Sequence, residues 1–139
     1  MSNISYSDAF NRYGAKLSNP RWAVSAIAED GSLVLSCWSH LFSRPNKETL
    51  RYTDKLSRWG NNTPGNNLLR AHLTQAVQTN LPIRLVIVVP TEKVSEDYEG
   101  DGSTIKKTFN CREDLTGRIS EFDGDQFVVD FQRKRPTGA

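Results

Sequence analysis

The sequence predicts a single α+β domain with a mixed, largely antiparallel sheet and two main helices. Two segments carry apolar residues at helical spacing, and several shorter runs are alternating or wholly apolar, as strands are. Their order is helix, hairpin, long loop, helix, strand, acidic loop, strand and hairpin, which is typical of an α+β domain. The 139 residues suit one domain, which we place at residues 1–132, followed by a basic tail at residues 133–139.

The first helix is predicted over residues 5–18, where large apolar side chains from Tyr6 to Leu17 share one face. Ser5 or Ser7 is expected to be its N-cap. Two strands follow, at residues 22–29 and 32–38. Asp30-Gly31 joins them, a dipeptide that favours the tight type I′ turn of a β-hairpin.

The most apolar segment of the chain is the strand predicted at Ile83–Val89. It follows a helix predicted from Thr63 to Asn80, since Pro64 suits a first helical turn and Pro82 stops the helix. The apolar face of this helix holds Leu69, Leu73, Ala76 and Val77. The strand is apolar on both faces after Arg84, so we expect it at the centre of the sheet.

The remaining elements are less regular. Residues 38–63 read as loop, with a short helix around residues 47–56. Five acidic residues and two glycines at residues 92–103 predict a solvated, mobile loop. A strand at residues 105–111 and a final hairpin, 118–122 with 126–132 around Asp123-Gly124, complete the sheet.

Charge is divided unevenly along the chain, although the net charge is only +2. Residues 1–90 carry ten Lys and Arg against five Asp and Glu, whereas residues 91–132 carry five against eleven. The tail adds three more basic residues. The excess of basic residues in 1–90 and of acidic residues in 91–132 predicts a surface that binds a charged partner.

The composition is that of an ordinary globular protein and predicts a cytoplasmic location. No apolar run approaches the roughly 20 residues that span a membrane, so we expect no membrane partner. The N-terminus lacks the pattern of a signal peptide. Cys37 and Cys111, two cysteines in a long chain, are expected to be buried small hydrophobes.

The candidate nucleic-acid-binding site is the stretch from residue 38 to residue 70. It holds six basic residues against two acidic ones, with aromatic and Asn side chains between them. Basic side chains neutralise phosphates, planar rings stack on bases, and Asn pairs with base edges. We assign phosphate contacts to Arg44, Lys47, Arg51, Lys55, Arg58 and Arg70, stacking to Tyr52 and Trp59, and base edges to Asn61 and Asn62. The alternative is a solvated charged face over core aromatic residues.

Catalysis and metal binding have weaker support. Cys37 and His40 have a zinc-like spacing, with His72 and Cys111 as further candidates, but a second closely spaced pair is missing. The carboxylates of the final hairpin are candidates for a metal-dependent nuclease, although those beside Gly124 suit turn chemistry alone. No catalytic motif is present, so we expect a binding module without a cofactor rather than an enzyme.

Several segments together resemble a known family. They are Leu33–Trp38, the polar loop after it, the helix Asn67–Asn80, the strand Ile83–Val89 and the aromatic strand Phe127–Phe131. In order and character they resemble the N-terminal modified-cytosine-sensing domain of HNH-type, methylation-dependent restriction endonucleases. The resemblance covers about two thirds of the chain, and the HNH nuclease half is absent. It implies a DNA-reading module whose loop at residues 38–62 approaches a base.

We therefore predict a DNA-binding module with double-stranded DNA as its partner. The resemblance implies that it recognises modified bases in a restriction or phage-defence context. The first alternative is a protein-interaction module or homodimer, in which basic and acidic surfaces meet charged partners or each other. The second is a small metal-dependent nuclease.

Overall fold

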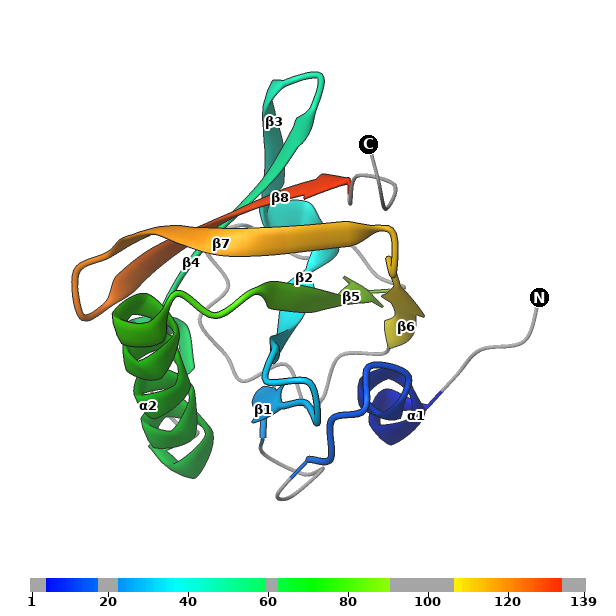
Figure 1. Cartoon of the computed structure of the whole chain (residues 1–139), viewed down its shortest axis with the longest axis vertical. Coiled ribbons are helices and arrows are strands. Elements are labelled where there is room, and N and C mark those ends of the chain that lie inside the picture. Colours follow the sequence, from blue (N-terminus) through cyan, green and yellow to red (C-terminus); the bar gives the residue numbers. More distant parts are fainter. Residues whose placement is uncertain (1–4, 18–22, 60–62, 91–106, 134–139) are drawn as a thin grey trace.

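The computed structural model describes residues 5–17, 23–59, 63–90 and 107–133, and Figure 1 shows their arrangement. The two helices are α1 (Tyr6–Asn11) and α2 (Thr63–Thr79), and two short 3-10 helices are η1 (Ser39–Leu41) and η2 (Leu56–Trp59). The strands are β1 (Ser25–Ile27), β2 (Leu33–Trp38), β3 (Phe42–Asn46), β4 (Thr49–Lys55), β5 (Ile83–Pro90), β6 (Lys107–Cys111), β7 (Leu115–Phe122) and β8 (Gln126–Arg133).

All eight described strands belong to one sheet. Its order is β1-β2-β5-β7-β8-β4-β3, and β6 pairs with β5 off this path. Among these strands β2 and β5 are parallel and every other pair is antiparallel. The predicted α+β class, with its mixed and largely antiparallel sheet and two main helices, is confirmed.

Strand β5 lies inside the sheet, as its apolar sequence predicts. One edge pairs with β2 along six residues. The other edge pairs first with β7, through Ile83 and Gly117, and then with β6 from Val86 to Pro90. The side chains from Ile83 to Val86 are buried, because neighbouring elements cover both faces of the strand.

The two helices pack against opposite faces of the sheet. Leu69, Leu73 and Ala76 of α2 join the larger core cluster, which includes Leu33 and Leu85. Ala9 and Phe10 of α1 join a smaller cluster, with Val34 and Val86. Since successive residues of a strand point to opposite faces, the alternation along β2 and β5 separates these two cores.

Two details of the helices differ from the prediction. Helix α1 has the expected Ser5 cap, whose side chain accepts a hydrogen bond from the Asp8 N–H, but it ends at Asn11. Gly14 then adopts a φ of +77°, a conformation that ends helices and favours glycine. Val77, which we placed on the buried face of α2, is 52% exposed, so the apolar stripe of α2 is narrower than predicted.

The short helix predicted around residues 47–56 is wrong, because β3 and β4 form a hairpin there. The spacing of Leu50, Thr53 and Leu56 suggested a helix. In the structure Tyr52 and Asp54 are buried, and Thr53 between them is only partly covered, which is the two-residue period of a strand. Thr and Tyr also favour strands, since their side chains pack well on a pleated surface.

The charged Arg84 of β5 is accommodated on the α1 side of the sheet. Its guanidinium carbon lies 4.7 Å from the centre of the Tyr13 ring, a cation–π contact. Its Nη2 donates to the Glu113 carbonyl at 2.8 Å, and the Tyr13 hydroxyl donates to the Leu85 carbonyl at 2.8 Å. These contacts allow a cation in an otherwise apolar central strand.

A buried hydroxyl connects two strands that are not neighbours in the sheet. The Tyr52 hydroxyl on β4 accepts the Trp38 N–H from the end of β2 at 3.2 Å. It donates to Asp54 Oδ2 at 2.6 Å, and Asp54 Oδ1 accepts the Lys55 N–H at 2.8 Å. Burial, above all, raises the pKa of Tyr52 well above its ordinary value, so the hydroxyl keeps its proton. The sheet is therefore curved, so that the end of β2 lies beside β4 although the two strands are not neighbours in the sheet.

Removing this hydroxyl should destabilise the fold strongly. Tyr52→Phe keeps the ring but removes the hydrogen bonds that the hydroxyl makes with the Trp38 N–H and with one oxygen of buried Asp54. We expect the free energy of unfolding to fall by roughly 2–4 kcal/mol. Tyr6→Phe is the matched control, since the Tyr6 hydroxyl bonds the Ala23 carbonyl and the Ser36 side chain, both uncharged, and its loss should cost about 1 kcal/mol. Urea unfolding measures both variants. Equal losses would contradict a special role for Tyr52.

A candidate nucleic-acid interface at the β3–β4 hairpin

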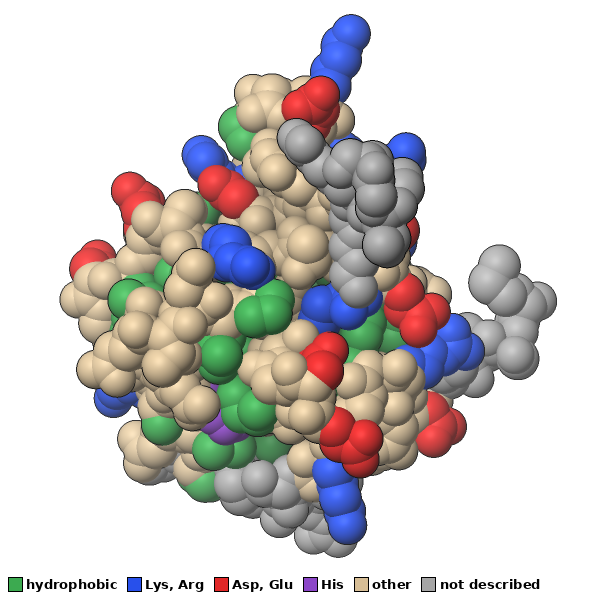
Figure 2. All heavy atoms as spheres, viewed as in Figure 1, with side chains coloured by type: hydrophobic (Ala, Val, Ile, Leu, Met, Phe, Trp, Pro, Cys, Tyr) green, Lys and Arg blue, Asp and Glu red, His purple; other side chains and the backbone are tan. Residues whose placement is uncertain are grey.

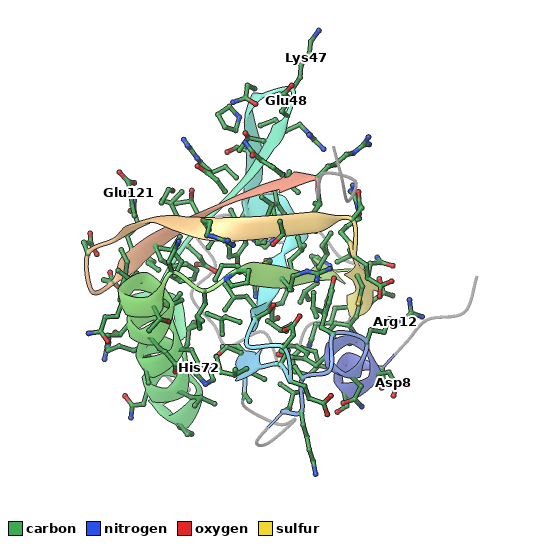
Figure 3. The ribbon with its side chains drawn as sticks, viewed as in Figure 1. Asp8, Arg12, Lys47, Glu48, His72 and Glu121 are labelled. Carbon is green, nitrogen blue, oxygen red and sulfur yellow. The ribbon has the colours of Figure 1, made fainter. Side chains whose placement is uncertain are left out.

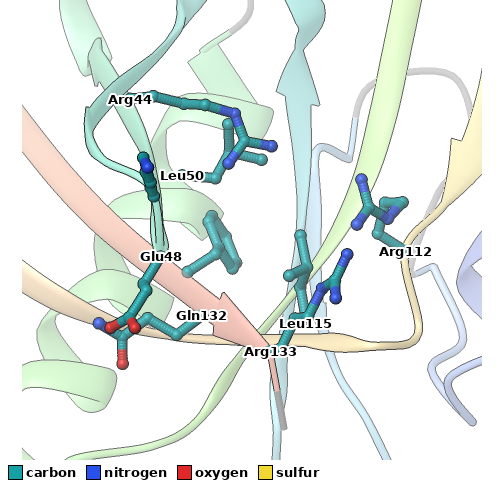
Figure 4. Close-up of a pocket in the computed structure, with 9 residues that line it drawn as sticks. Arg44, Glu48, Leu50, Arg112, Leu115, Gln132 and Arg133 are labelled. Carbon is teal, nitrogen blue, oxygen red and sulfur yellow. The ribbon is translucent and has the colours of Figure 1, made fainter.

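A hollow of about 480 Å³ lies between the β3–β4 hairpin, the end of β8 and the turn from β6 to β7. It is lined by Arg44, Lys47, Glu48, Leu50, Arg112, Leu115, Phe131, Gln132 and Arg133. Figure 4 shows guanidinium groups facing this space from two sides, Arg44 from β3 and Arg112 and Arg133 from opposite it. We call this group of residues the basic hollow.

A β-bulge in β3 places Arg44. Ser43 pairs with Arg51, whereas Asn46 pairs with Thr49, so β3 has one more residue than β4 between these two pairs. Arg44 and Pro45 therefore both lie opposite Leu50. A bulge bends the strand and redirects its side chains, and Figure 4 shows Arg44 lying beside Leu50.

The opposite wall comes from the β6–β7 turn and the end of β8. Nε and Nη2 of Arg112 donate to the two carboxylate oxygens of Asp114, each at 2.9 Å. Arg133, which pairs with Leu115 across the sheet, lies 3.9 Å from the same carboxylate. The hydrogen bonds from Arg112, more than any other cause, lower the pKa of Asp114 to about 2. A charged Asp114 thus orients Arg112 through two hydrogen bonds and lies beside the more exposed Arg133.

The floor of the hollow belongs to the domain core. Phe131 and Leu115 are buried, and Leu50 is half-buried beside them. Gln132 Nε2 donates to Thr49 Oγ1 at 3.1 Å, which joins β8 to the first residue of β4. The basic side chains are therefore mounted on strands packed into the core.

The rim has an excess of positive charge. Four of the nine lining residues are basic and one, Glu48, is acidic; Asp114 stands beside them. Among the residues that the structure describes, neither Arg44 nor Lys47 forms an ion pair. Figure 2 shows basic side chains over β3 and β4 with acidic ones between them. Exposed cations without carboxylate partners are available to anions such as phosphate.

The structure divides the predicted binding residues. Arg44 and Lys47 belong to the basic hollow. Lys55 is exposed at the far end of β4, on the order of 25 Å along the strand from Lys47 at about 3.3 Å per residue. Arg70 is exposed on α2. The six cations predicted from the sequence thus do not form one surface.

The structure bears on two further predicted roles. Tyr52 is fully buried and cannot stack on a base, so that prediction is wrong. Arg51 Nε and Nη2 donate to the two oxygens of Asp130, at 2.7 and 3.0 Å, across the β4–β8 pair. Arg51, whose side chain is 40% exposed, is therefore engaged in a surface ion pair away from the basic hollow, and its phosphate contact stays a prediction. Its pair with Asp130 supports the base of the hairpin.

Four predicted residues remain untested by the structure. Asn61 and Asn62 lie outside the described residues, as do the side chains of Arg58 and Trp59. The acidic loop predicted at residues 92–103 and most of the predicted basic tail lie outside them too. Arg133, which we assigned to the tail, is the last residue of β8.

Sequence reasoning missed Arg112 and undervalued Arg133. Arg112 belongs to the part of the chain with an acidic balance, so the count of charges hid it. The residues that carry the hollow come from the β3–β4 hairpin and from residues 112–133, far apart in the sequence. The pairing of β8 with both β4 and β7 brings the end of β8 beside the hairpin. The alternation of apolar and polar residues in these strands was the sequence signal from which this pairing could have been inferred.

The carboxylates of the final hairpin have structural partners. Asp123 Oδ1 accepts the Asp125 and Gln126 N–H groups, a turn contact. Asp125 accepts the Ser57 N–H at 2.8 Å, which holds η2, and Asp130 accepts Arg51. The nuclease hypothesis relied on these carboxylates, and the structure gives each of these three a structural contact.

The four candidate zinc ligands lie in different surroundings. Cys37 is fully buried in the larger core, whereas the Cys111 thiol contacts the Ala9 carbonyl at 3.4 Å. His72 Nδ1 is 2.7 Å from Ser25 Oγ, and in Figure 3 the ring points from α2 toward β1. The part of the chain that the structure describes has no group of three or more His, Cys, Asp or Glu placed to hold a metal ion.

Comparisons with known proteins identify no relative. No family model, curated protein or solved structure matches the chain. In the described ranges, no helix has the length and apolar character needed to cross a membrane.

The burial of His72 predicts a loss of stability in acid. Burial lowers the pKa of His72 below its ordinary value of 6.5. As the pH falls, His72 is therefore protonated in the unfolded chain before it is protonated in the folded one, and the free energy of unfolding decreases. The loss should begin near pH 6.5 and continue until His72 is protonated in the folded state too. Urea unfolding at several pH values between 7.5 and 5 measures it.

His72→Asn is the matched control, because its side-chain oxygen can accept from Ser25 but cannot bind a proton at these pH values. Its stability should depend less on pH than that of the unaltered protein. The same pH dependence in both proteins would show that His72 is not responsible.

Proposed function

We propose that this chain is a nucleic-acid-binding module that holds the backbone of double-stranded DNA at the basic hollow. The observation that carries the proposal is the convergence of Arg44, Arg112 and Arg133 on one space (Figure 4), which Lys47 also lines. Guanidinium groups bind phosphate through two parallel hydrogen bonds, and a group of them releases several counterions at once.

The architecture supports backbone binding. Arg112 and Arg133 extend from the β6–β7 turn and the end of β8, beside buried Leu115 and Phe131. Arg44 is placed by the pairing of β3 with β4, so the backbone that carries these arginines is ordered before a phosphate binds.

Asp114 partly neutralises Arg112, whereas Arg44 and Lys47 have no ion pair with any residue that the structure describes. A duplex whose phosphates follow the rim is a better fit than a small anion, because the cations surround an open hollow and not one point.

The homodimer alternative is less well supported at this edge of the sheet. Strand β3 is an edge strand that carries a bulge, Pro45 and exposed charged residues. These features prevent a second strand from pairing, since they break the row of hydrogen-bonding groups. The same features leave Arg44 and Lys47 open to a ligand.

The resemblance noted in the sequence gives the proposal its finer form. On that basis the DNA carries a modified cytosine, the biological context is restriction or phage defence, and the compartment is the cytoplasm. Duplexes that differ only in unmodified cytosine, 5-methylcytosine and 5-hydroxymethylcytosine test this form separately from backbone binding.

Removing arginines from the rim should weaken DNA binding and its salt dependence. In fluorescence anisotropy with an unmodified duplex, Arg44→Ala and Arg133→Ala should each reduce the slope of log K against log salt by up to about 0.9. The double variant should lose about twice as much. Arg12→Ala, at the end of α1 and away from the hairpin in Figure 3, is the matched control and should bind as the unaltered protein does.

Two outcomes would refute backbone binding at the hollow. One is the absence of salt-sensitive binding to any duplex by the unaltered protein at low salt. The other is a double variant whose affinity and salt slope match those of Arg12→Ala. Equal binding to all three cytosine forms would refute only the finer proposal.

A further inference from the structure

The tip of the β3–β4 hairpin has no packing role in the domain. Every residue from Ser43 to Glu48 is exposed, whereas Thr49 is buried at the start of β4. The hairpin projects from the body of the molecule in Figure 1, and Lys47 and Glu48 extend from its end in Figure 3. Exposed, projecting residues of this kind are explained by contact with a partner better than by stability.

The tip is nevertheless held in a defined shape. Asn46 pairs with Thr49, so Lys47 and Glu48 form a two-residue turn. The Asn46 side-chain oxygen accepts the Glu48 N–H at 2.9 Å, an Asx contact that fixes the turn. At the base, the pairs Arg51–Asp130 and Gln132–Thr49 attach the hairpin to β8. The two tip side chains are therefore presented on a supported ribbon.

From this geometry we infer that the hairpin enters the major groove of DNA and that Lys47 and Glu48 read the edge of G·C base pairs there. The inference rests on the proposed function, since the basic hollow would hold the backbone beside the groove. A two-stranded ribbon is of the right width, because the major groove of B-form DNA admits either an α-helix or such a ribbon.

The two side chains complement a G·C pair. Guanine presents two adjacent acceptors in the major groove, N7 and O6, to which a Lys ammonium donates. Cytosine presents its N4 amino group, which donates to a carboxylate such as Glu48. A carboxylate can only accept hydrogen bonds, so it cannot pair with the acceptors of guanine or with O4 of thymine. It can accept from adenine N6, but in an A·T pair that amino group lies between the acceptors N7 and O4, whereas in a G·C pair the two acceptors lie side by side, next to the cytosine amino group. Neighbouring donor and acceptor side chains at one tip thus match the two halves of one base pair.

Glu48 is the informative residue. A carboxylate on the rim of a phosphate-binding site repels the phosphates, so it lowers the affinity of a protein that grips only the backbone. Its position at the tip is useful if it discriminates between base pairs, through a favourable contact with the amino group of cytosine and an unfavourable one where an acceptor stands in that place. Removing the charge of Lys47 should therefore lower the affinity for DNA, and removing the charge of Glu48 should raise it. Either change should reduce the selectivity for G·C.

The test uses short duplexes of equal length that differ in one groove at a time. Replacing guanine by 7-deazaguanine removes N7 from the major groove, whereas replacing it by inosine removes the amino group from the minor groove and leaves the major-groove edge intact. We expect G·C and inosine·C duplexes to bind equally well. The 7-deazaguanine duplex and an A·T duplex should bind at least about fivefold more weakly, the lower end of what a good base contact contributes.

The variants assign this preference to the tip. Lys47→Met should weaken binding to the G·C duplex and make it insensitive to 7-deazaguanine. Glu48→Gln should strengthen binding to all duplexes and reduce the preference for G·C over A·T. Glu29→Gln, an exposed residue at the β1–β2 turn, is the matched control and should preserve both affinity and preference.

The outcomes separate this inference from the proposed function. Equal binding of the unaltered protein to the G·C, 7-deazaguanine and A·T duplexes, with salt dependence that still requires Arg44 and Arg133, would overturn groove reading and leave backbone binding intact. A loss of affinity with inosine alone would also overturn it, since it would place the contact in the minor groove. A complete lack of binding would overturn both.

Discussion

The curvature of the sheet depends on the buried hydroxyl of Tyr52. Strands β2 and β4 are separated in the sheet by β5, β7 and β8, yet the Trp38 N–H at the end of one donates to a side chain of the other. The link occurs immediately before η1, which leads the chain from β2 into β3. Because Asp54 accepts from the same hydroxyl, β4 is fixed to the larger core, and the orientation of the projecting hairpin follows from that attachment.

The basic hollow is a consequence of strand pairing within this sheet and not a feature of any one segment. Its cations come from a bulged edge strand on one side and from the β6–β7 turn and β8 on the other. Arg112 and Arg133 lie beside the core residues Leu115 and Phe131, and Arg44 lies on β3, which pairs with the core strand β4. Core packing thus supplies the rigidity, and charge at the rim supplies the chemistry. Such a division allows a small domain to keep several cations close together despite their mutual repulsion.

The sequence predicted what depends on local patterns. The apolar runs of β2 and β5, the positions of the turns at Gly31 and Gly124, and the start and end of α2 all follow from neighbouring residues. The turn before Gly31 is not the predicted type I′, because Asp30 has no positive φ and the Gly31 N–H donates to the Ala28 carbonyl. The β3–β4 hairpin was missed, because Leu50 and Leu56 imitate helical spacing while the decisive contact of Tyr52 is made with distant Trp38. Half of the site was missed for a related reason: Arg112 joins Arg44 only through strand pairing, which charge counting along the chain cannot reveal.

The exposure of residues 43–48 has a consequence for how this domain can change. None of these side chains belongs to either core, whereas Thr49 and the buried residues after it anchor the hairpin. The tip can therefore be rewritten while the folded scaffold is retained, so ligand preference and thermodynamic stability are under separate selection. A designer could exchange these six residues as a cassette, and descendants of one ancestral domain could diverge in what they recognise without any repacking of the interior.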